Sequence, residues 1–120
     1  MIQEMTYQQY MEFIQHTSES IFSECPVRKT LELLNGKWKL ILIYELSKKN
    51  SYRFGELRKA IPTITNTMLT SALRELEQID IVHREQYNEI PPHVEYSLTE
   101  KGKSFFPMFF EIAKWGEKYL

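Results

Sequence analysis

The chain has 120 residues, of which 42% are hydrophobic, so it is long enough to fold as one domain with a buried core. Its net charge of −1 excludes a global polycation, and its single cysteine, Cys25, excludes an intrachain disulfide framework and a cysteine-based zinc site. A lone cysteine is typical of a reducing compartment, and no apolar stretch reaches the ~18 residues of a membrane span. The first ten residues lack the pattern of a signal peptide, so we expect a cytoplasmic protein.

The charged residues are distributed unevenly along the chain. Residues 1–25 carry four acidic and no basic side chains, residues 26–60 carry nine basic and three acidic ones, and residues 61–120 carry six basic and nine acidic ones. A basic segment between acidic flanks indicates a local surface for a polyanion. A solvated helix face would give the same composition, so composition alone leaves both interpretations open.

Two helices are expected before residue 36. Apolar side chains near helical spacing over residues 5–22 predict an amphipathic helix. A second helix is expected to begin at Pro26, since proline suits the first helical position, and to end at Asn35-Gly36. Residues 37–47 are ambiguous, because their apolar residues form a helical stripe but also contain a run that could be a buried strand. The length of the segment favours a helix.

The clearest helix of the chain covers residues 66–78, with Thr65 as a good N-cap. Before it, residues 52–54 are expected to form a short strand and residues 55–61 a short helix that Pro62 ends. The inward stripe of the longer helix is expected to consist of Met68, Leu69, Ala72, Leu73 and Leu76. A helix, a tight turn and a second helix with a polar outer face make a helix-turn-helix.

After this helix the hydrophobic period changes to two. Residues 82–87 and 93–98 predict two strands joined by a hairpin loop, which would be a wing. Thr99 is expected to cap a final helix that reaches Leu120 and is interrupted by Pro107. The predicted fold class is therefore mostly α with a small β hairpin, a winged helix-turn-helix that dimerises through its terminal helices. We divide the chain into a dimerising helical extension at 1–24, a DNA-binding core at 25–98 and a dimerisation helix at 99–120.

This arrangement predicts double-stranded DNA as the partner. The second helix of the motif would enter the major groove, with the side chains near its N-terminus at the base edges. Asn66 can read adenine, and the nearby hydroxyl groups can bond to bases or phosphates. The residues expected at the base edges are Thr65, Asn66, Thr67, Thr70 and Ser71. The cations expected at phosphates are Lys37, Lys39, Arg53, Arg58 and Arg74, with Arg84 on the wing reaching a phosphate or the minor groove.

Several motifs follow one another between Cys25 and about Trp115. They are Cys25-Pro26-Val27, Gly36-Lys37-Trp38-Lys39, Arg53-Phe54-Gly55-Glu56-Leu57, Met68-Leu69-Thr70, Leu73-Arg74-Glu75-Leu76-Glu77 and the run from Pro91 to Gly102. Together they resemble the HxlR-type winged helix-turn-helix regulators of bacteria, a MarR-like family. The resemblance implies a dimeric DNA-binding regulator with its interface on the terminal helices. The chain departs from the family pattern at Thr67, where relatives often carry a basic residue or glutamine, and at Ser71, where they often carry glutamine. These departures leave the target sequence unpredictable.

Cys25 allows two interpretations. It precedes the helix start at Pro26, where helix amides and the cations Arg28 and Lys29 would stabilise a thiolate, while Glu24 opposes this. The resemblance implies a sensing thiol, since some members of the family detect electrophiles or oxidants through a cysteine at this position. The signal would then be an oxidant or a small molecule. An ordinary packed thiol is the alternative.

Aromatic residues surround the last expected helix on more than one face, and a monomer of this size cannot bury them all. We therefore expect a homodimer, with an intramolecular core or a small-ligand pocket as the alternative. The expected interface residues are Tyr7, Tyr10, Ile14, Phe105, Phe109, Ile112 and Trp115. Trp38 is expected to anchor the core rather than stack on a ligand.

No cofactor, metal or catalytic role is expected. His16, His83 and His93 lie on separate elements without ligand spacing, and the sequence has no serine elbow or glycine-rich phosphate loop. The predicted function is a sequence-specific transcriptional regulator, a repressor or an activator, that binds an inverted repeat as a homodimer and responds to redox or electrophile stress. The alternative is a winged-helix protein-interaction module that does not bind DNA, because the reading helix is nearly neutral.

Overall fold

The computed structural model describes residues 1–16 and 25–120, which form two compact units, Met1–Asn35 and Gly36–Leu120. The first unit contains a short 3-10 helix η1 (Ile2–Glu4) and two α-helices, α1 (Tyr7–Gln15) and α2 (Pro26–Leu33). The first predicted helix begins at Tyr7 because Thr6 caps it. The Thr6 hydroxyl accepts from the backbone N–H of Gln9 at 3.2 Å, and the Gln9 side chain accepts from the Thr6 N–H at 3.0 Å. Residues 17–22 of that prediction, and Glu24, lie outside the described residues.

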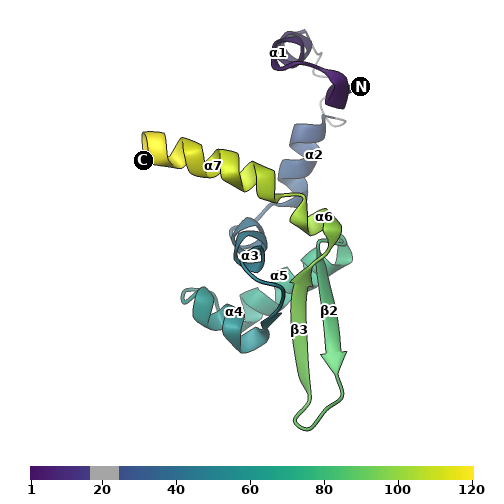
Figure 1. Cartoon of the computed structure of the whole chain (residues 1–120), viewed down its shortest axis with the longest axis vertical. Coiled ribbons are helices and arrows are strands. Elements are labelled where there is room, and N and C mark those ends of the chain that lie inside the picture. Colours follow the sequence, from purple (N-terminus) through teal and green to yellow (C-terminus); the bar gives the residue numbers. More distant parts are fainter. Residues whose placement is uncertain (17–24) are drawn as a thin grey trace. The chain divides into compact units, whose positions relative to one another are not determined.

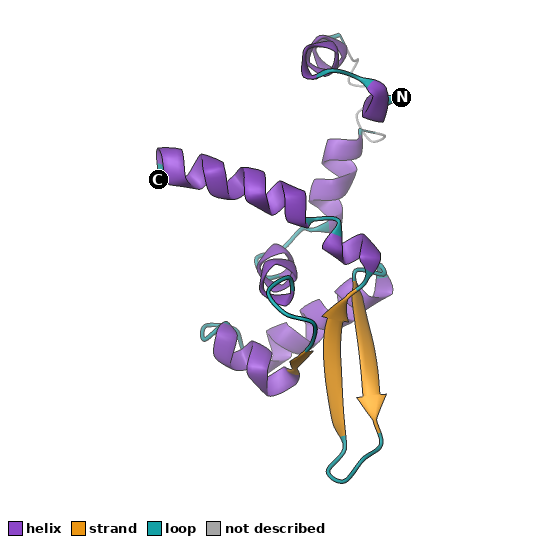
Figure 2. Ribbon diagram, in the orientation of Figure 1, coloured by secondary structure: helices purple, strands orange, loops and turns teal. Residues whose placement is uncertain are grey.

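The second unit is a winged helix-turn-helix, as the sequence predicts (Figure 1; Figure 2). Its elements are α3 (Lys39–Leu46), β1 (Tyr52–Arg53), α4 (Phe54–Ala60), α5 (Asn66–Gln78), β2 (Val82–Tyr87), β3 (His93–Leu98), α6 (Glu100–Lys103) and α7 (Phe106–Tyr119). The three strands form an antiparallel sheet in the order β1-β3-β2. The long hairpin of β2 and β3 projects from the helices, while α7 leaves the unit at the other end (Figure 1).

The ambiguous segment 37–47 is a helix, α3, whose Leu42, Ile43 and Leu46 are buried. The C-terminal helix is interrupted, as the sequence predicts, and forms α6 and α7. The break, however, lies at Ser104 and Phe105 and not at Pro107, which occupies the first turn of α7. A proline there removes only an N–H that has no partner within the helix, so it begins this helix and does not interrupt it.

The core of the second unit lies where α3, α4, α5 and the base of the hairpin meet. Its fully buried side chains are Leu42, Ile43, Leu46, Leu57, Ile64, Leu69, Leu73, Leu76, Ile81 and Val82. Phe105, which we expected at a dimer interface, is only 8% exposed, so we reassign it to the buried core. Met68, which we expected to face inward, is 47% exposed because it lies at the edge of the stripe formed by Leu69, Ala72, Leu73 and Leu76.

A close backbone contact joins the hairpin to α6. The Thr99 hydroxyl donates to the Asp80 carbonyl at 2.6 Å and accepts from the Gly102 N–H at 3.1 Å. A Cβ atom at Gly102 would lie 2.4 Å from the Ile81 carbonyl oxygen, so only glycine lets α6 approach this closely. This joint fixes the direction in which the wing leaves the core.

Candidate nucleic-acid interface

The reading helix α5 presents one continuous polar face. Its N-cap is Thr65, whose hydroxyl accepts from the backbone N–H of Met68 at 3.1 Å. The side chains opposite the buried stripe are all exposed: Asn66, Thr67, Thr70, Ser71 and Arg74. The face expected from the sequence is therefore open to solvent and contains short polar side chains that can approach base edges.

One contact crosses the turn of the helix-turn-helix motif. Arg58 on α4 donates from Nη1 to Oδ1 of Asn66, the first residue of α5. The Arg58 side chain is half-buried, whereas Asn66 is exposed. The sequence predicted Arg58 as a phosphate contact and Asn66 as a base contact, and the structure brings the two together as a pair.

A second contact holds α5 from the side. Lys39 on α3 forms an ion pair with Glu75 on α5, with Nζ 2.9 Å from Oε2. The Lys39 side chain is only 18% exposed, against 52% for Glu75. Lys39 was expected at a phosphate, but its ammonium group is engaged between two helices and ties α5 to α3.

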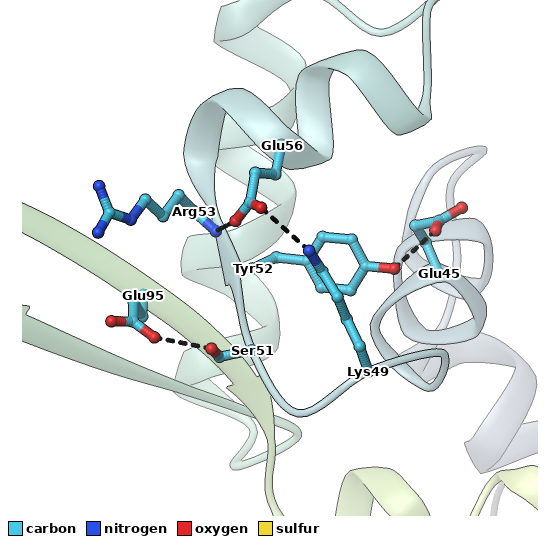
Figure 3. Close-up of polar contacts among 7 residues, drawn as sticks. All are labelled: Glu45, Lys49, Ser51, Tyr52, Arg53, Glu56 and Glu95. Atoms are coloured by element: carbon cyan, nitrogen blue, oxygen red, sulfur yellow. Dashed lines mark hydrogen bonds and ion pairs between the residues drawn. The ribbon is translucent and has the colours of Figure 1, made fainter.

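A network of polar contacts, which the sequence analysis missed, positions β1 and the start of α4 (Figure 3). The Tyr52 hydroxyl donates to Glu45 at 2.8 Å, and burial together with this carboxylate raises the pKa of Tyr52 to about 12. The Glu56 carboxylate accepts from the Arg53 N–H at 2.7 Å and pairs with Lys49 at 3.0 Å. These two contacts hold the pKa of Glu56 below its ordinary value. The start of the helix-turn-helix is thus fixed by side chains from α3, the turn after it, β1 and α4.

The cations beside this network differ in their surroundings. Arg53 is exposed, and its guanidinium extends away from the Glu56 carboxylate that its own backbone N–H contacts (Figure 3). Lys37 is also exposed, with its ammonium 4.7 Å from the centre of the half-buried Trp38 ring. Together with Arg74 on α5, these side chains remain available for phosphate contacts in the way that the sequence predicted.

The wing is more acidic than its single arginine implied. Arg84 is exposed on β2, but residues 82–98 also hold Glu85, Glu89 and Glu95. Hydrogen bonds from Ser51 at 2.7 Å and His93 at 2.9 Å lower the pKa of Glu95, which keeps this carboxylate ionised. The charge of Glu85, followed by those of Glu95 and Glu89, raises the pKa of Tyr87. Arg84 therefore lies among carboxylates. The sequence would have shown this if the acidic residues of the wing had been counted together with its arginine.

The expected interface residues differ in exposure. On α7, Ile112 is 59% and Trp115 58% exposed, whereas the half-buried Phe109 packs edge-on against Tyr44 with ring centres 5.4 Å apart. In the first unit, Tyr7 is 77% and Ile14 40% exposed, and Tyr10 is half-buried. Both units thus present large apolar side chains on their terminal helices.

Cys25 is the N-cap residue of α2. Its backbone carbonyl accepts from the Lys29 N–H at 2.9 Å, while its half-buried side chain makes no cap hydrogen bond to the helix. Within residues 1–16 and 25–120, no three His, Cys, Asp or Glu side chains are grouped so as to hold a metal ion. Over the same residues, no helix is both long enough and apolar enough to cross a membrane.

Comparison with known proteins agrees with this geometry. The model of the HxlR-like helix-turn-helix family matches residues 33–120. The HTH-type transcriptional regulator YdeP of Bacillus subtilis (strain 168) is 50% identical over 102 residues, which cover 85% of this chain and 79% of YdeP. A structure described as a MarR-family transcriptional regulator from Porphyromonas gingivalis W83 is 41% identical with a TM-score of 0.77, covering 87% of this chain and 97% of its own.

A further solved structure is that of the redox regulator HypR in its oxidized form. It is 49% identical to this chain with a TM-score of 0.72, over 80% of this chain and 98% of its own. Family match, sequence identity and fold therefore agree, and the chain belongs to the HxlR-like helix-turn-helix family of transcriptional regulators.

Proposed function

We propose that this chain binds operator DNA as a homodimer and recognises an inverted repeat. The observation that carries the proposal is the exposed polar face of α5, which follows a capped N-terminus and is held in place by α3 and α4. A helix of this kind fits the major groove, where Thr67, Thr70 and Ser71 would meet base edges. Arg53 and Arg74 would contact phosphates of the DNA backbone beside that groove. Binding of chromosomal DNA places this activity in the cytoplasm.

Dimerisation is supported by the exposed apolar side chains of the terminal helices. Ile112 and Trp115 on α7, and Tyr7 and Ile14 on α1, are large apolar side chains that are 40–77% exposed, and clustered exposed apolar side chains mark an interaction surface. Pairing these helices across a two-fold axis would bury that surface. To meet two half-sites at once, the two α5 helices of the dimer would have to lie about 34–36 Å apart, the length of one duplex turn. Light scattering at micromolar concentration should therefore give the mass of a dimer.

The DNA-binding proposal is tested by selecting target duplexes from a random pool and measuring affinity at several salt concentrations. Thr70→Ala should relax the base preference at one position, at a cost of about 1–3 kcal/mol for the matched site. Arg74→Ala should weaken binding to all sequences and reduce the salt slope of the dimer by about two, because one phosphate contact is lost in each protomer. Lys118→Ala, near the end of α7, is the matched control and should change neither. If the wild-type chain shows no salt-dependent affinity for any duplex, the protein-interaction module is the better description.

We further propose that Cys25 makes the regulator sensitive to oxidants or quinones. Its half-buried thiol at the start of α2, and the 49% identity to a redox regulator, support this role. With one cysteine per chain, oxidation can join two thiols from two protomers, or one thiol and a small thiol, with two electrons and two protons passing to the oxidant. With a quinone, the thiol would instead add to the quinone ring and form a carbon–sulfur bond. DNA binding should change after treatment with diamide or benzoquinone in the native protein but not in Cys25→Ser. Equal responses from the two proteins would show that Cys25 is not the sensor.

A further inference from the structure

We propose that Arg58 is a positioning residue for Asn66, and that Asn66 reads DNA through its Nδ2 donor rather than as an adenine-reading amide. The inference rests on the proposed function and gives a specificity role to a residue that the sequence assigned to phosphates. It depends on the contact between α4 and the first residue of α5, on the burial of Arg58, and on the hydrogen-bonding chemistry of the two side chains.

The contact fixes the orientation of the Asn66 amide. An arginine guanidinium carries only donors, so the atom that faces it must be the amide oxygen and not the amide nitrogen. Nη1 of Arg58 accordingly donates to Oδ1 of Asn66. Because Oδ1 faces Arg58, Nδ2 occupies the other branch of the planar amide group, and its two N–H donors take no part in this contact. An asparagine without such a partner could rotate its amide group by about 180°, whereas this contact holds the Asn66 amide in one orientation.

Arg58 is poorly placed to act as a simple phosphate anchor. Its side chain is half-buried, and its Nε is closed off from solvent without a hydrogen-bond partner among the described residues. Arg53 and Arg74, by contrast, are exposed to solvent. Shielding part of a guanidinium from water is costly, and the charge-assisted bond to Asn66 offsets part of that cost, so the pair is expected to persist when DNA binds.

The fixed amide selects among bases. The bidentate adenine contact of an asparagine uses Oδ1 as the acceptor for the adenine N6 amino group. Here one of the two lone pairs of Oδ1 already accepts from a cation in a charge-assisted hydrogen bond, which makes the oxygen a weaker acceptor for a second, neutral donor such as N6. The Nδ2 group is left to meet acceptors, and guanine is the base whose major-groove edge presents two, N7 and O6. Asn66 lies in the first turn of α5, the part of a recognition helix that contacts base edges.

The test compares base preferences on the operator selected by the wild-type protein. Asn66→Ala, Arg58→Met and the double variant should flatten the preference at the same single base pair, by about five- to hundredfold, with no further loss in the double variant. Arg53→Met is the matched control, because it removes an exposed guanidinium from the same part of the motif. It should lower affinity for all sequences and reduce the salt slope of the dimer by about two, one contact being lost in each protomer.

Two further measurements separate the donor from the acceptor. Asn66→Asp keeps an oxygen for Arg58 but lacks Nδ2, so it should lose the preference as fully as Asn66→Ala does. Replacing the preferred guanine with 7-deazaguanine, which lacks N7, should weaken wild-type binding but not that of Asn66→Ala. Substitutions at the exposed Asn66 should not disturb folding, so these two measurements remain informative even if Arg58→Met does not fold.

The outcomes that overturn the inference are distinct from failure of the proposed function. Retention of the base preference by Asn66→Asp would show that Asn66 reads through its oxygen. A uniform loss of affinity in Arg58→Met, with a reduced salt slope and an unchanged preference, would make Arg58 a phosphate contact. In both cases the protein would still bind DNA. Absence of salt-dependent DNA binding by the wild-type protein would instead refute the proposed function itself.

Discussion

Replacing Gly102 with alanine is expected to destabilise the second unit, although alanine is the better helix former. Gly102 lies in α6, where it packs against the end of β3 and the carbonyl of Ile81. A Cβ atom there would lie 2.4 Å from the Ile81 oxygen and 2.9 Å from Cδ2 of Leu98, where ordinary contacts begin at 3.4 Å. The nearest atom belongs to the backbone, so it cannot rotate away as a side chain could.

The size of the effect follows from two opposing terms. Alanine gains about 0.5–1 kcal/mol over glycine within a helix. Forcing an extra carbon into a packed site costs about 1–3 kcal/mol, and a backbone carbonyl about 1 Å too close favours the upper part of that range. The expected net loss is about 1–2 kcal/mol, which for a chain of this size lowers Tm by about 3–10 °C.

Thermal unfolding followed by circular dichroism measures this loss, and the chain provides its own controls. A Cβ at Gly55 would meet nothing within 4 Å, and one at Gly116 would meet only Cδ1 of Leu120 at 4.0 Å. Gly55→Ala and Gly116→Ala should therefore leave Tm unchanged or raise it slightly. A Tm of Gly102→Ala equal to that of the wild type would show that α6 does not approach the Ile81 carbonyl, and the joint at the base of the wing would be misplaced.

Three further changes test other contacts. Lys39→Met should lower stability by up to about 1 kcal/mol through loss of the pair with Glu75, without changing the salt slope of DNA binding; a smaller slope at unchanged stability would make Lys39 a phosphate contact. Tyr52→Phe should cost about 1–3 kcal/mol, because the hydroxyl bonds to the Glu45 carboxylate. Since folding raises the pKa of Tyr52 to about 12, its contribution is complete below about pH 10 and lost as the pH rises through 12. Urea unfolding at pH 8 and 11 should therefore show a smaller alkaline loss in Tyr52→Phe. Arg84→Ala should weaken binding to every sequence, and unchanged affinity with unchanged salt slope would remove the wing from the interface.

Hydrophobic periodicity was sufficient to predict most of the fold. The stripe at Leu69, Ala72, Leu73 and Leu76 located α5, and the change to a period of two located the wing. Local cap chemistry gave the start of α5 at Thr65, since a threonine before an apolar repeat satisfies free helix N–H groups. These features depend on neighbours along the chain, which a sequence displays directly.

The pairings at the site could not be obtained in the same way. Arg58 and Asn66, or Lys39 and Glu75, meet because elements separated by a turn or by a whole helix pack in one particular arrangement. Periodicity indicates which face a side chain occupies, but it does not give the position of the end of a long side chain. The sequence therefore assigned every cation near the helix-turn-helix to a phosphate, although two of them, Lys39 and Arg58, hold α5 in place.

The same pairings limit how strongly salt should act on DNA binding. Of the cations expected at phosphates, Lys37, Arg53, Arg74 and Arg84 are exposed, and Arg84 has Glu85 beside it. Four phosphate contacts per protomer, or eight per dimer, give a slope of log K against log salt no steeper than about −7, since each neutralised phosphate contributes about −0.9. Repulsion between phosphates and the ionised wing glutamates should make the measured slope shallower. Affinity for the matched site must then depend largely on contacts between α5 and the bases. A slope steeper than about −7 in titrations between 50 and 300 mM KCl would show that further lysines reach the DNA and that base contacts carry less of the affinity.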